Sequence, residues 1–179
     1  MRIAIFGGSF DPVHIAHVAI VEAALENLNI DKLIIVPTYL NPFKNSFYLK
    51  PEIRFELLTK VFQKFKKVEI SNYEINQKKV SYTVDTVNYL NSLYQPTKIY
   101  FILGEDNIEN LDKWYKINDL KKMVEFVVAT RKGFESNKAK EFKILDINID
   151  ISSTLLREHI DMNYVPIEIK DDILNLKKG

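Results

Sequence analysis

The sequence contains no cysteine. This absence excludes disulfide bonds, thiol nucleophiles and thiolate zinc sites, and it suits a reducing compartment. Long apolar runs are also missing. No segment reaches the roughly 18 apolar residues of a membrane span, and the N-terminal run Ile3–Phe6 is too short for the apolar region of a signal peptide. We therefore expect a cytoplasmic protein that does not enter a membrane.

An excess of charge of one sign is missing as well. The 25 lysines and arginines nearly balance the 24 aspartates and glutamates, and the formal net charge is +1. Such a chain has no bulk attraction for nucleic acid or an anionic membrane, so an anionic partner should be small and held locally. Hydrophobic residues make up 46% and charged residues 27% of the 179 residues, which is typical of a globular chain. We expect a single domain over residues 1–179, with residues 151–179 as its helical C-terminal part.

Apolar runs of strand length recur along the chain, and most are continuous, as expected for strands buried on both faces. They lie at residues 2–6, 32–37, 67–75, 98–104, 125–131 and 142–149. Segments that read as helices lie at residues 14–28, 51–65, 83–94, 152–160 and 166–178. This order predicts an α/β fold, a Rossmann-like parallel sheet with helices on both faces and a small C-terminal helical appendage. Ligands are then expected at the carboxyl ends of the strands.

Rare residues gather in the stretch GGSFDPVHIAH, Gly7–His17. The whole chain has five glycines and three histidines, yet two of each fall within this stretch. Gly7 and Gly8 end the first predicted strand and admit close approaches that a Cβ would block. The turn formers that follow lead into a helix starting near His14, so free amides and the positive end of the helix dipole face one spot. These features outline a site for an anion.

His14 and His17 are three residues apart, which places them on one face of the first helical turn. Two imidazoles beside a phosphate can donate hydrogen bonds to its oxygens and counter the charge that develops when a phosphoanhydride is attacked. Two alternatives stay open from the residues alone. One histidine could cap the helix while the other is a core residue, or both could bind a metal. The metal site is disfavoured because Asp11 and Glu22 are poorly placed to complete it.

GGSFDPVHIAH resembles the GGSFDPxHxGH signature of the nucleotidylyltransferase superfamily, which includes the nicotinate-nucleotide adenylyltransferases. ISSTLLR at residues 151–157 resembles the ISSTxxR motif of the same family. SYTVDT at 81–86 and GEDNIENLDKW at 104–114 resemble segments of the bacterial nicotinate-mononucleotide enzymes, and NPFK ends in Lys44, where the family has a lysine after a proline. The resemblance covers almost the whole chain. It implies adenylyl transfer from ATP to nicotinate mononucleotide, which forms nicotinate adenine dinucleotide and pyrophosphate in NAD biosynthesis.

The resemblance also implies a role for each matching residue. The expected catalytic residues are His14, His17, Lys44 and Arg157, with Lys44 steering the attacking phosphate and the others acting on the ATP phosphates. ATP is expected to contact Gly7, Gly8, Ser9, Phe10, Ser153, Thr154 and Arg131. Nicotinate mononucleotide is expected to contact Tyr82, Thr83, Asp106, Trp114 and Tyr115, with the indole of Trp114 stacked on the pyridine ring. Arg54 is a weaker candidate for the attacking phosphate.

No covalent intermediate and no protein-held metal are implied, and Mg²⁺ is expected to arrive with ATP. Two residues depart from the family pattern. Ala16 stands where the family usually has glycine, which adds a methyl group near the expected adenosine. Phe43 stands where a histidine often precedes the lysine, so any contact made by that histidine is lost.

Other functions remain open from the residues alone. Each of these residues also has a purely structural alternative. Residues 152–154 could serve as a helix cap and nothing more, Lys44 could be a solvated surface lysine, and Trp114 could be a core residue. Within the enzymes, the alternative is a pantetheine-phosphate adenylyltransferase-like protein, against which SYTVDT and Trp114 argue. Outside them, the alternative is a regulator that binds nucleotides without turnover. The sequence leaves homo-oligomerisation open.

Overall fold

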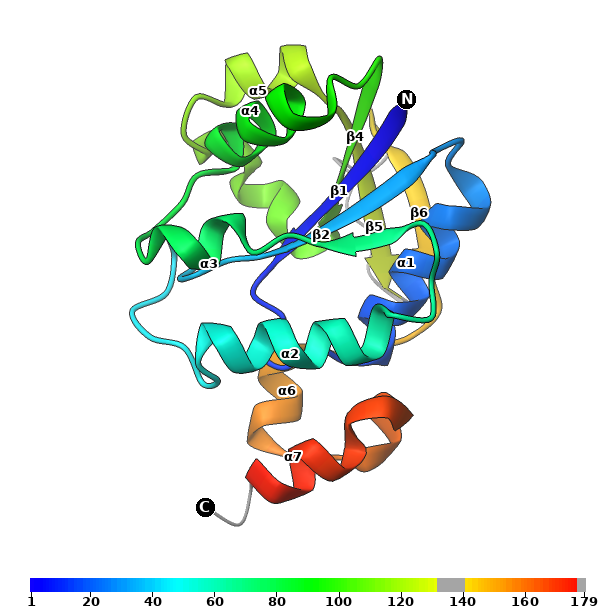
Figure 1. The fold of residues 1–179 in the computed structure, drawn as a ribbon, viewed down its shortest axis with the longest axis vertical. Coiled ribbons are helices and arrows are strands. Elements are labelled where there is room, and N and C mark those ends of the chain that lie inside the picture. Colours follow the sequence, from blue (N-terminus) through cyan, green and yellow to red (C-terminus); the bar gives the residue numbers. More distant parts are fainter. Residues whose placement is uncertain (132–140, 177–179) are drawn as a thin grey trace.

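The computed structural model describes residues 1–131 and 141–176, and its centre is a six-stranded parallel sheet (Figure 1). The strands are β1 (Arg2–Gly8), β2 (Lys32–Pro37), β3 (Val68–Ile70), β4 (Lys98–Gly104), β5 (Glu125–Arg131) and β6 (Lys143–Ile147). They are arranged in the order β3-β2-β1-β4-β5-β6, and every neighbouring pair is parallel. The predicted α/β class and Rossmann-like arrangement are confirmed.

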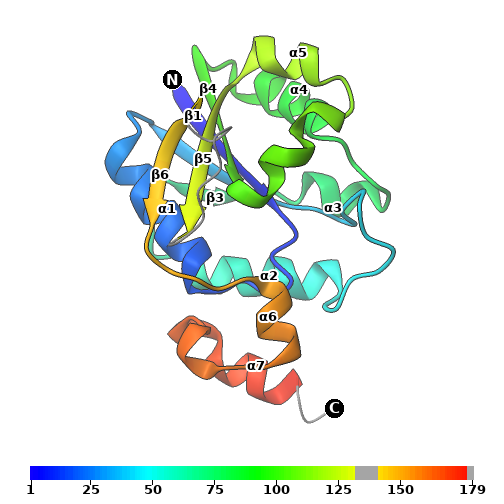
Figure 2. The same ribbon diagram turned by 180° about the vertical axis from the view of Figure 1, so that it is seen from behind.

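Helices cover both faces of this sheet (Figures 1 and 2). One face carries α1 (Ile15–Asn27) and α2 (Pro51–Phe62). The other carries α4 (Thr83–Tyr94), the 3₁₀ helix η1 (Glu105–Lys113) and α5 (Ile117–Met123). Each face buries its own apolar cluster, as continuous apolar strands require.

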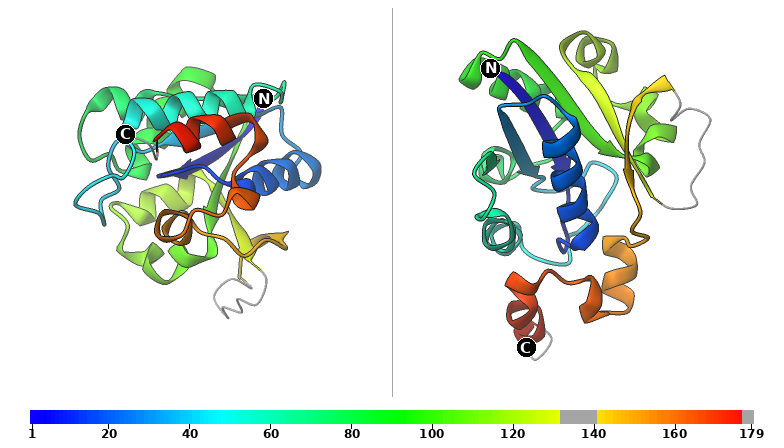
Figure 3. Two further views of the ribbon diagram at one scale, coloured as in Figure 1. Left: turned by 90° about the horizontal axis from the view of Figure 1, so that it is seen from below. Right: turned by 90° about the vertical axis from the view of Figure 1, so that its right-hand side faces the viewer.

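The C-terminal segment packs next to α2 (Figure 3). It consists of α6 (Ser153–Glu158), η3 (Met162–Tyr164), η4 (Ile167–Ile169) and α7 (Lys170–Leu176). Ile169 and Ile173 are buried in the cluster that also holds residues of α2. Two surface ion pairs accompany this contact, Lys60–Asp172 at 2.6 Å and Lys64–Glu168 at 2.8 Å. The predicted helical appendage is therefore present, and residues 177 and 178 of the helix predicted there lie outside the described residues.

The predicted strand at residues 67–75 is wrong beyond Ile70, where β3 ends. The chain then enters α3 (Tyr73–Gln77), in which the backbone N–H of Asn76 donates to the carbonyl of Asn72 at 2.9 Å. β3 is the edge strand and pairs only with β2, so the sheet does not hold the segment extended. The helical turn buries Glu74 and Ile75 instead. Helices η1 and α5 have few buried residues, and the apolar pattern did not reveal them.

The chain order reverses at β1. The chain runs outward from β1 through β2 to β3, and then returns to β4 on the other side of β1. In open α/β sheets, ligands bind at the carboxyl ends of the strands at this reversal. Among the described residues, no helix is long and apolar enough to cross a membrane.

Candidate active site

A cleft of about 610 Å³ opens where β1 and β4 end, and its size suits a small organic ligand. Most of the predicted site residues line it: Gly7, Gly8, Ser9, Phe10, His14, His17, Lys44, Tyr82, Thr83, Asp106, Trp114, Tyr115, Ser153 and Thr154. Ala16 and Phe43, the two departures from the family pattern, line it as well. Arg131 ends β5, but its side chain lies outside what the structure describes. The fold therefore gathers segments that are distant in the sequence.

The turn after β1 needs glycine at Gly8. A Cβ there would lie 3.0 Å from the ring carbon Cζ of Phe10. Phe10 itself has a φ of 47°, a left-handed conformation that is costly for a residue with a side chain. Its buried ring packs edge-on against Phe6, with 5.2 Å between ring centroids. This packing holds the turn at the mouth of the cleft.

The two histidines open helix α1. His14 is the N-cap residue, and its backbone N–H donates to Nδ1 of His17 at 3.1 Å. The two rings stack with 3.7 Å between their centroids. Since Nδ1 of His17 accepts a hydrogen bond, the neutral ring carries its proton on Nε2, which makes Nε2 the donor nitrogen. The capping alternative is thus realised for His14, and both side chains also line the cleft.

Asp11 ties the loop that carries Lys44 to the turn after β1. Its buried carboxylate accepts hydrogen bonds from the backbone N–H groups of Tyr48 at 2.8 Å and Leu49 at 2.7 Å. Both residues lie at the end of this loop, directly before α2. From the sequence, Asp11 was expected to be a turn former and was weighed as a metal ligand, but this anchoring role was not predicted. An aspartate in a turn before a helix often accepts backbone hydrogen bonds, but the sequence does not show that the donors are the N–H groups of Tyr48 and Leu49.

Arg54 is held away from any ligand. Its side chain is 1% exposed, and its guanidinium donates to three carbonyls: Leu49 at 3.2 Å, Ser9 at 2.6 Å and Tyr39 at 2.9 Å. These contacts join the two ends of the Lys44 loop to the turn after β1. The structure therefore does not support the expected phosphate contact of Arg54, because three of its N–H groups donate to backbone carbonyls and the residue is not among those that line the cleft. Burial lowers the pKa of Arg54, which still remains a cation.

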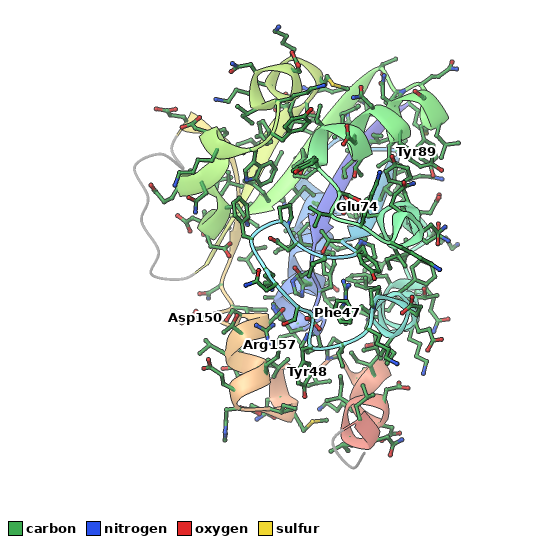
Figure 4. All side chains as sticks on the ribbon, turned by 90° about the vertical axis from the view of Figure 1, so that its left-hand side faces the viewer. Phe47, Tyr48, Glu74, Tyr89, Asp150 and Arg157 are labelled. Carbon is green, nitrogen blue, oxygen red and sulfur yellow. The ribbon has the colours of Figure 1, made fainter. Side chains whose placement is uncertain are left out.

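Arg157 connects α6 to the same turn. Its Nη1 donates to the carbonyl of Asp11 at 2.7 Å, and its Nη2 donates to Oγ1 of Thr154 at 3.0 Å. Ser153 also donates, from Oγ to the carbonyl of Pro12, at 3.0 Å. Figure 4 shows Arg157 and Tyr48 on the same side of the molecule, and both contact Asp11. Ser152, not Ser153, caps α6, with its Oγ accepting from the backbone N–H of Leu155.

Lys44 brings a positive charge into the cleft, whereas the side chains of Arg157 and Arg54 are not among those that line it. The side chain as a whole is exposed, but the cleft walls partly desolvate its ammonium group, and this desolvation lowers the pKa of Lys44. The charges of Arg157 and Arg54 lower it further, whereas Asp11 and Asp106 act in the opposite direction. A gathering of cations at this point favours a ligand with several negative charges.

The opposite half of the cleft is aromatic. The rings of Tyr82 and Tyr115 are 4.7 Å apart, and Trp114 packs edge-on against Phe101 with 6.1 Å between centroids. Tyr82 is the N-cap residue of α4, and the first amides of a helix have no carbonyl partner within it. This half of the cleft therefore offers a flat ring surface next to amide donors.

A buried carboxyl group, Glu74, lies behind these amides. Its side chain is 6% exposed and lines the cleft from α3 (Figure 4). Oγ1 of Thr86, in the first turns of α4, donates to its Oε1 at 2.5 Å. Burial raises the pKa of Glu74 to about 7, although the hydrogen bond from Thr86 opposes this shift. Glu74 was not predicted as a site residue, because the apolar pattern places it in a strand.

No group of three or more histidine, cysteine, aspartate or glutamate side chains could hold a metal ion within residues 1–131 and 141–176. The carboxylate of Asp11, which lies nearest to the histidines in the chain, already accepts two backbone hydrogen bonds. The polar groups that line the described cleft include many hydroxyls, the imidazoles of His14 and His17 and the cations of Lys44 and Lys113, which suit a phosphate-bearing ligand.

Comparison with known proteins agrees with this chemistry. The sequence model of the cytidylyltransferase-like family matches residues 5–159. The probable nicotinate-nucleotide adenylyltransferase of Aliarcobacter butzleri is 72% identical over all of this chain and 98% of its own length. That of Nitratiruptor is 48% identical over the full length of both proteins. The nicotinic acid mononucleotide adenylyltransferase of Plasmodium falciparum, solved in complex with NaAD, has 26% identity and a TM-score of 0.80, with 98% of this chain and 95% of that chain covered.

The fold and the cleft thus define a nucleotidyltransferase of the cytidylyltransferase-like type. Within that class, the chain belongs to the family of nicotinate-nucleotide adenylyltransferases.

Proposed function

We propose that this cleft transfers the adenylyl group of ATP to nicotinate mononucleotide and releases pyrophosphate. The observation that carries the proposal is the division of one cleft into two halves. One half has the glycine turn, the histidines and Lys44, and the other has Trp114 beside the amides of α4. The first half suits a triphosphate and the second suits a flat, anionic pyridine ring. The NaAD complex of the Plasmodium falciparum relative supports the same product.

The chemical step needs no protein nucleophile. An oxygen of the 5′-phosphate of nicotinate mononucleotide attacks the α-phosphorus of ATP and forms a new P–O bond. The bond from this phosphorus to the bridging oxygen breaks, and pyrophosphate leaves with the electron pair. The protein's contribution is alignment and stabilisation of negative charge.

The ATP half would act through donors fixed by the fold. His17 would donate from Nε2 to the phosphate chain, because Nδ1 is occupied by the backbone of His14. ATP would lie along the backbone of the turn formed by Gly7, Gly8, Ser9 and Phe10. Ser153, Thr154 and Arg157 would act at the β- and γ-phosphates, and Lys44 at the attacking phosphate. Arg131 remains a proposed ATP contact.

The pyridine half would bind nicotinate mononucleotide through ring stacking and backbone N–H groups. Trp114 would stack on the pyridine ring, while the start of α4 at Tyr82 and Thr83, together with Tyr115, would bind the nicotinate carboxylate. Asp106, which is exposed at the start of η1, would bind a ribose hydroxyl.

A divalent cation is generally used with ATP by nucleotidyltransferases of this kind, and we propose Mg²⁺. The described cleft fits a metal that arrives on the nucleotide, since it has no cluster of protein ligands for one. Phosphate oxygens and water would hold the ion, which neutralises part of the phosphate charge. A single domain over residues 1–179 and a cytoplasmic location stay predictions, and homo-oligomerisation stays open.

The function is tested by measuring pyrophosphate release from MgATP with three acceptors in parallel: nicotinate mononucleotide, nicotinamide mononucleotide and phosphopantetheine. We expect release with nicotinate mononucleotide and much less with the other two. Release with phosphopantetheine alone would identify a pantetheine-phosphate enzyme. No release from folded, ATP-binding protein would identify a nucleotide-binding regulator.

The Trp114→Ala variant should raise KM for nicotinate mononucleotide by about 10- to 100-fold, because a stacked ring contributes on the order of 1–3 kcal/mol. KM for ATP should change little, since the ATP half lies across the cleft. Steady-state kinetics with each substrate varied in turn measures both values. Phe126→Leu, in the same apolar cluster but outside the cleft lining, is the control for a general packing defect. Equal losses for both substrates would contradict the stacking role.

A further inference from the structure

Glu74 is a carboxyl group that the proposed chemistry does not use. It reaches the cleft from α3, and Oε1 is bonded to Thr86 of α4. Oε2 is buried and has no hydrogen-bond partner among the described residues. A buried carboxylate with one open oxygen is costly, whereas the protonated acid is tolerated. A buried titratable carboxyl group therefore lies next to the pyridine half of the cleft.

The Glu74 carboxyl lies close to the first backbone amides of α4, the expected site of the nicotinate carboxylate. Thr86 follows Tyr82 by one turn of α4, and its backbone N–H donates to the carbonyl of Tyr82 at 3.3 Å. A helical turn rises about 5.4 Å, so the carboxyl of Glu74 lies within one or two turns of the first amides of α4. At such a distance an unscreened negative charge acts strongly on another negative charge.

We propose that Glu74 is a specificity-determining residue: its neutral form admits an anionic pyridine carboxylate at the start of α4, and its ionised form repels that anion. This inference rests on the proposed function, since it concerns the acceptor of the same reaction. A neutral pyridine amide at this position is not repelled by either form. The preference for nicotinate over nicotinamide mononucleotide should therefore depend on pH.

The other titratable and charged groups around Glu74 do not account for a pH-dependent repulsion of the nicotinate carboxylate. Tyr73 precedes it on α3 and stacks on Tyr89 of α4, with 4.0 Å between ring centroids. Asp85 lies on α4 and is exposed. On β2, the strand next to α3, Lys32 is paired with Glu69 at 2.6 Å. Lys44, Asp106 and Lys113 line the cleft, and their charges would act alike on the two nucleotides, which differ only in the group on the pyridine ring.

The test compares the two nucleotides at a series of pH values. Because the pKa of Glu74 is about 7, the kcat/KM ratio of nicotinate to nicotinamide mononucleotide should fall about tenfold between pH 6 and pH 8. Titration of the phosphates and of groups that both nucleotides contact alike cancels in this ratio. Isothermal titration calorimetry provides the same ratio as Kd values.

Three variants make the test specific. Glu74→Gln should keep the nicotinate preference and abolish its pH dependence. Thr86→Val removes a hydrogen bond that favours the ionised form, so the midpoint should move to higher pH. Glu69→Gln, an exposed glutamate outside the cleft lining, should leave the profile unchanged.

Protein stability provides an independent readout. The folded protein keeps the proton of Glu74 up to about pH 7, whereas the unfolded chain releases it near the ordinary value of 4.5. The folded state then binds more protons in this range, so the free energy of unfolding should fall as pH rises from 4.5 to 7. Glu74→Gln should lose this part of the slope, measured by urea unfolding. The control Glu69→Gln should keep the slope between pH 4.5 and 7, because the pKa of Glu69 is lowered and its own contribution therefore changes below pH 4.5.

A flat nucleotide ratio in the wild type, or a ratio that still changes with pH in Glu74→Gln, would overturn the inference. It would also fail if the stability slope of Glu74→Gln equalled that of the wild type. If neither nucleotide reacts at any pH, the proposed function fails separately, and the Kd ratio alone decides about Glu74.

Discussion

Replacing His17 with alanine should lower kcat by about 100- to 1,000-fold while the protein remains folded. Removal of one fixed donor to developing negative charge has this order of magnitude. His17 is suited to that role because its Nδ1 accepts the backbone N–H of His14 and its ring stacks on the His14 ring. The imidazole is thus oriented before ATP binds, and little reorganisation is needed during the reaction. Single-turnover kinetics would measure the effect on chemistry directly.

His17→Ala also removes an acceptor at the start of α1, so a second variant is needed. Asparagine at this position can keep an acceptor near Nδ1 but has nothing at Nε2. An equal loss of turnover in His17→Asn would locate the effect at Nε2. The control is His159→Ala, because this third histidine is exposed at the end of α6 and has no assigned role. Near-normal turnover in both His17 variants would exclude the phosphate role of His17.

The residues of the cleft were largely predictable, because the sequence motifs and the predicted fold both place them at the carboxyl ends of the strands. A Gly-Gly pair after an apolar run marks the end of a buried strand, and His14 and His17 follow it at helical spacing. The ends of parallel strands meet at one edge, so Asp106 after β4 had to lie near this turn. Spacing and strand order therefore predicted where the histidines and Asp106 lie, whereas Lys44 and Trp114 were predicted from the family resemblance.

The missed features depend on long-range contacts. Glu74 was assigned to a strand because its neighbours are apolar, and only the edge position of β3 lets the chain turn into α3. Its proximity to Thr86 then follows from how α3 meets α4, which no periodicity encodes. Arg54 was a weaker candidate for the attacking phosphate, since a sequence does not show which carbonyls lie near its guanidinium.

Replacing Arg54 with methionine should lower the free energy of unfolding by about 3–5 kcal/mol, although Arg54 contacts no substrate. Its guanidinium satisfies three carbonyls from two loops, and hydrogen bonds from a charged group contribute about 1.5–3 kcal/mol each. Methionine fills a similar volume but leaves these carbonyls without their donor. Urea unfolding measures the loss. Arg2→Met, whose side chain donates to exposed Asn29, is the control and should change stability little.

The same variant should raise KM for nicotinate mononucleotide more than KM for ATP, because Arg54 holds both ends of the loop that carries Lys44. Arg54→Lys should not restore either property, since one ammonium cannot reach three carbonyls. If Arg54→Met does not fold, Asp11→Asn provides the milder test, because the amide group retains one acceptor of the two that bind Tyr48 and Leu49. A stable Asp11→Asn protein with unchanged KM for nicotinate mononucleotide would show that the Lys44 loop keeps its position without this anchor. The cation of Lys44 would then act independently of the buried contacts beneath it.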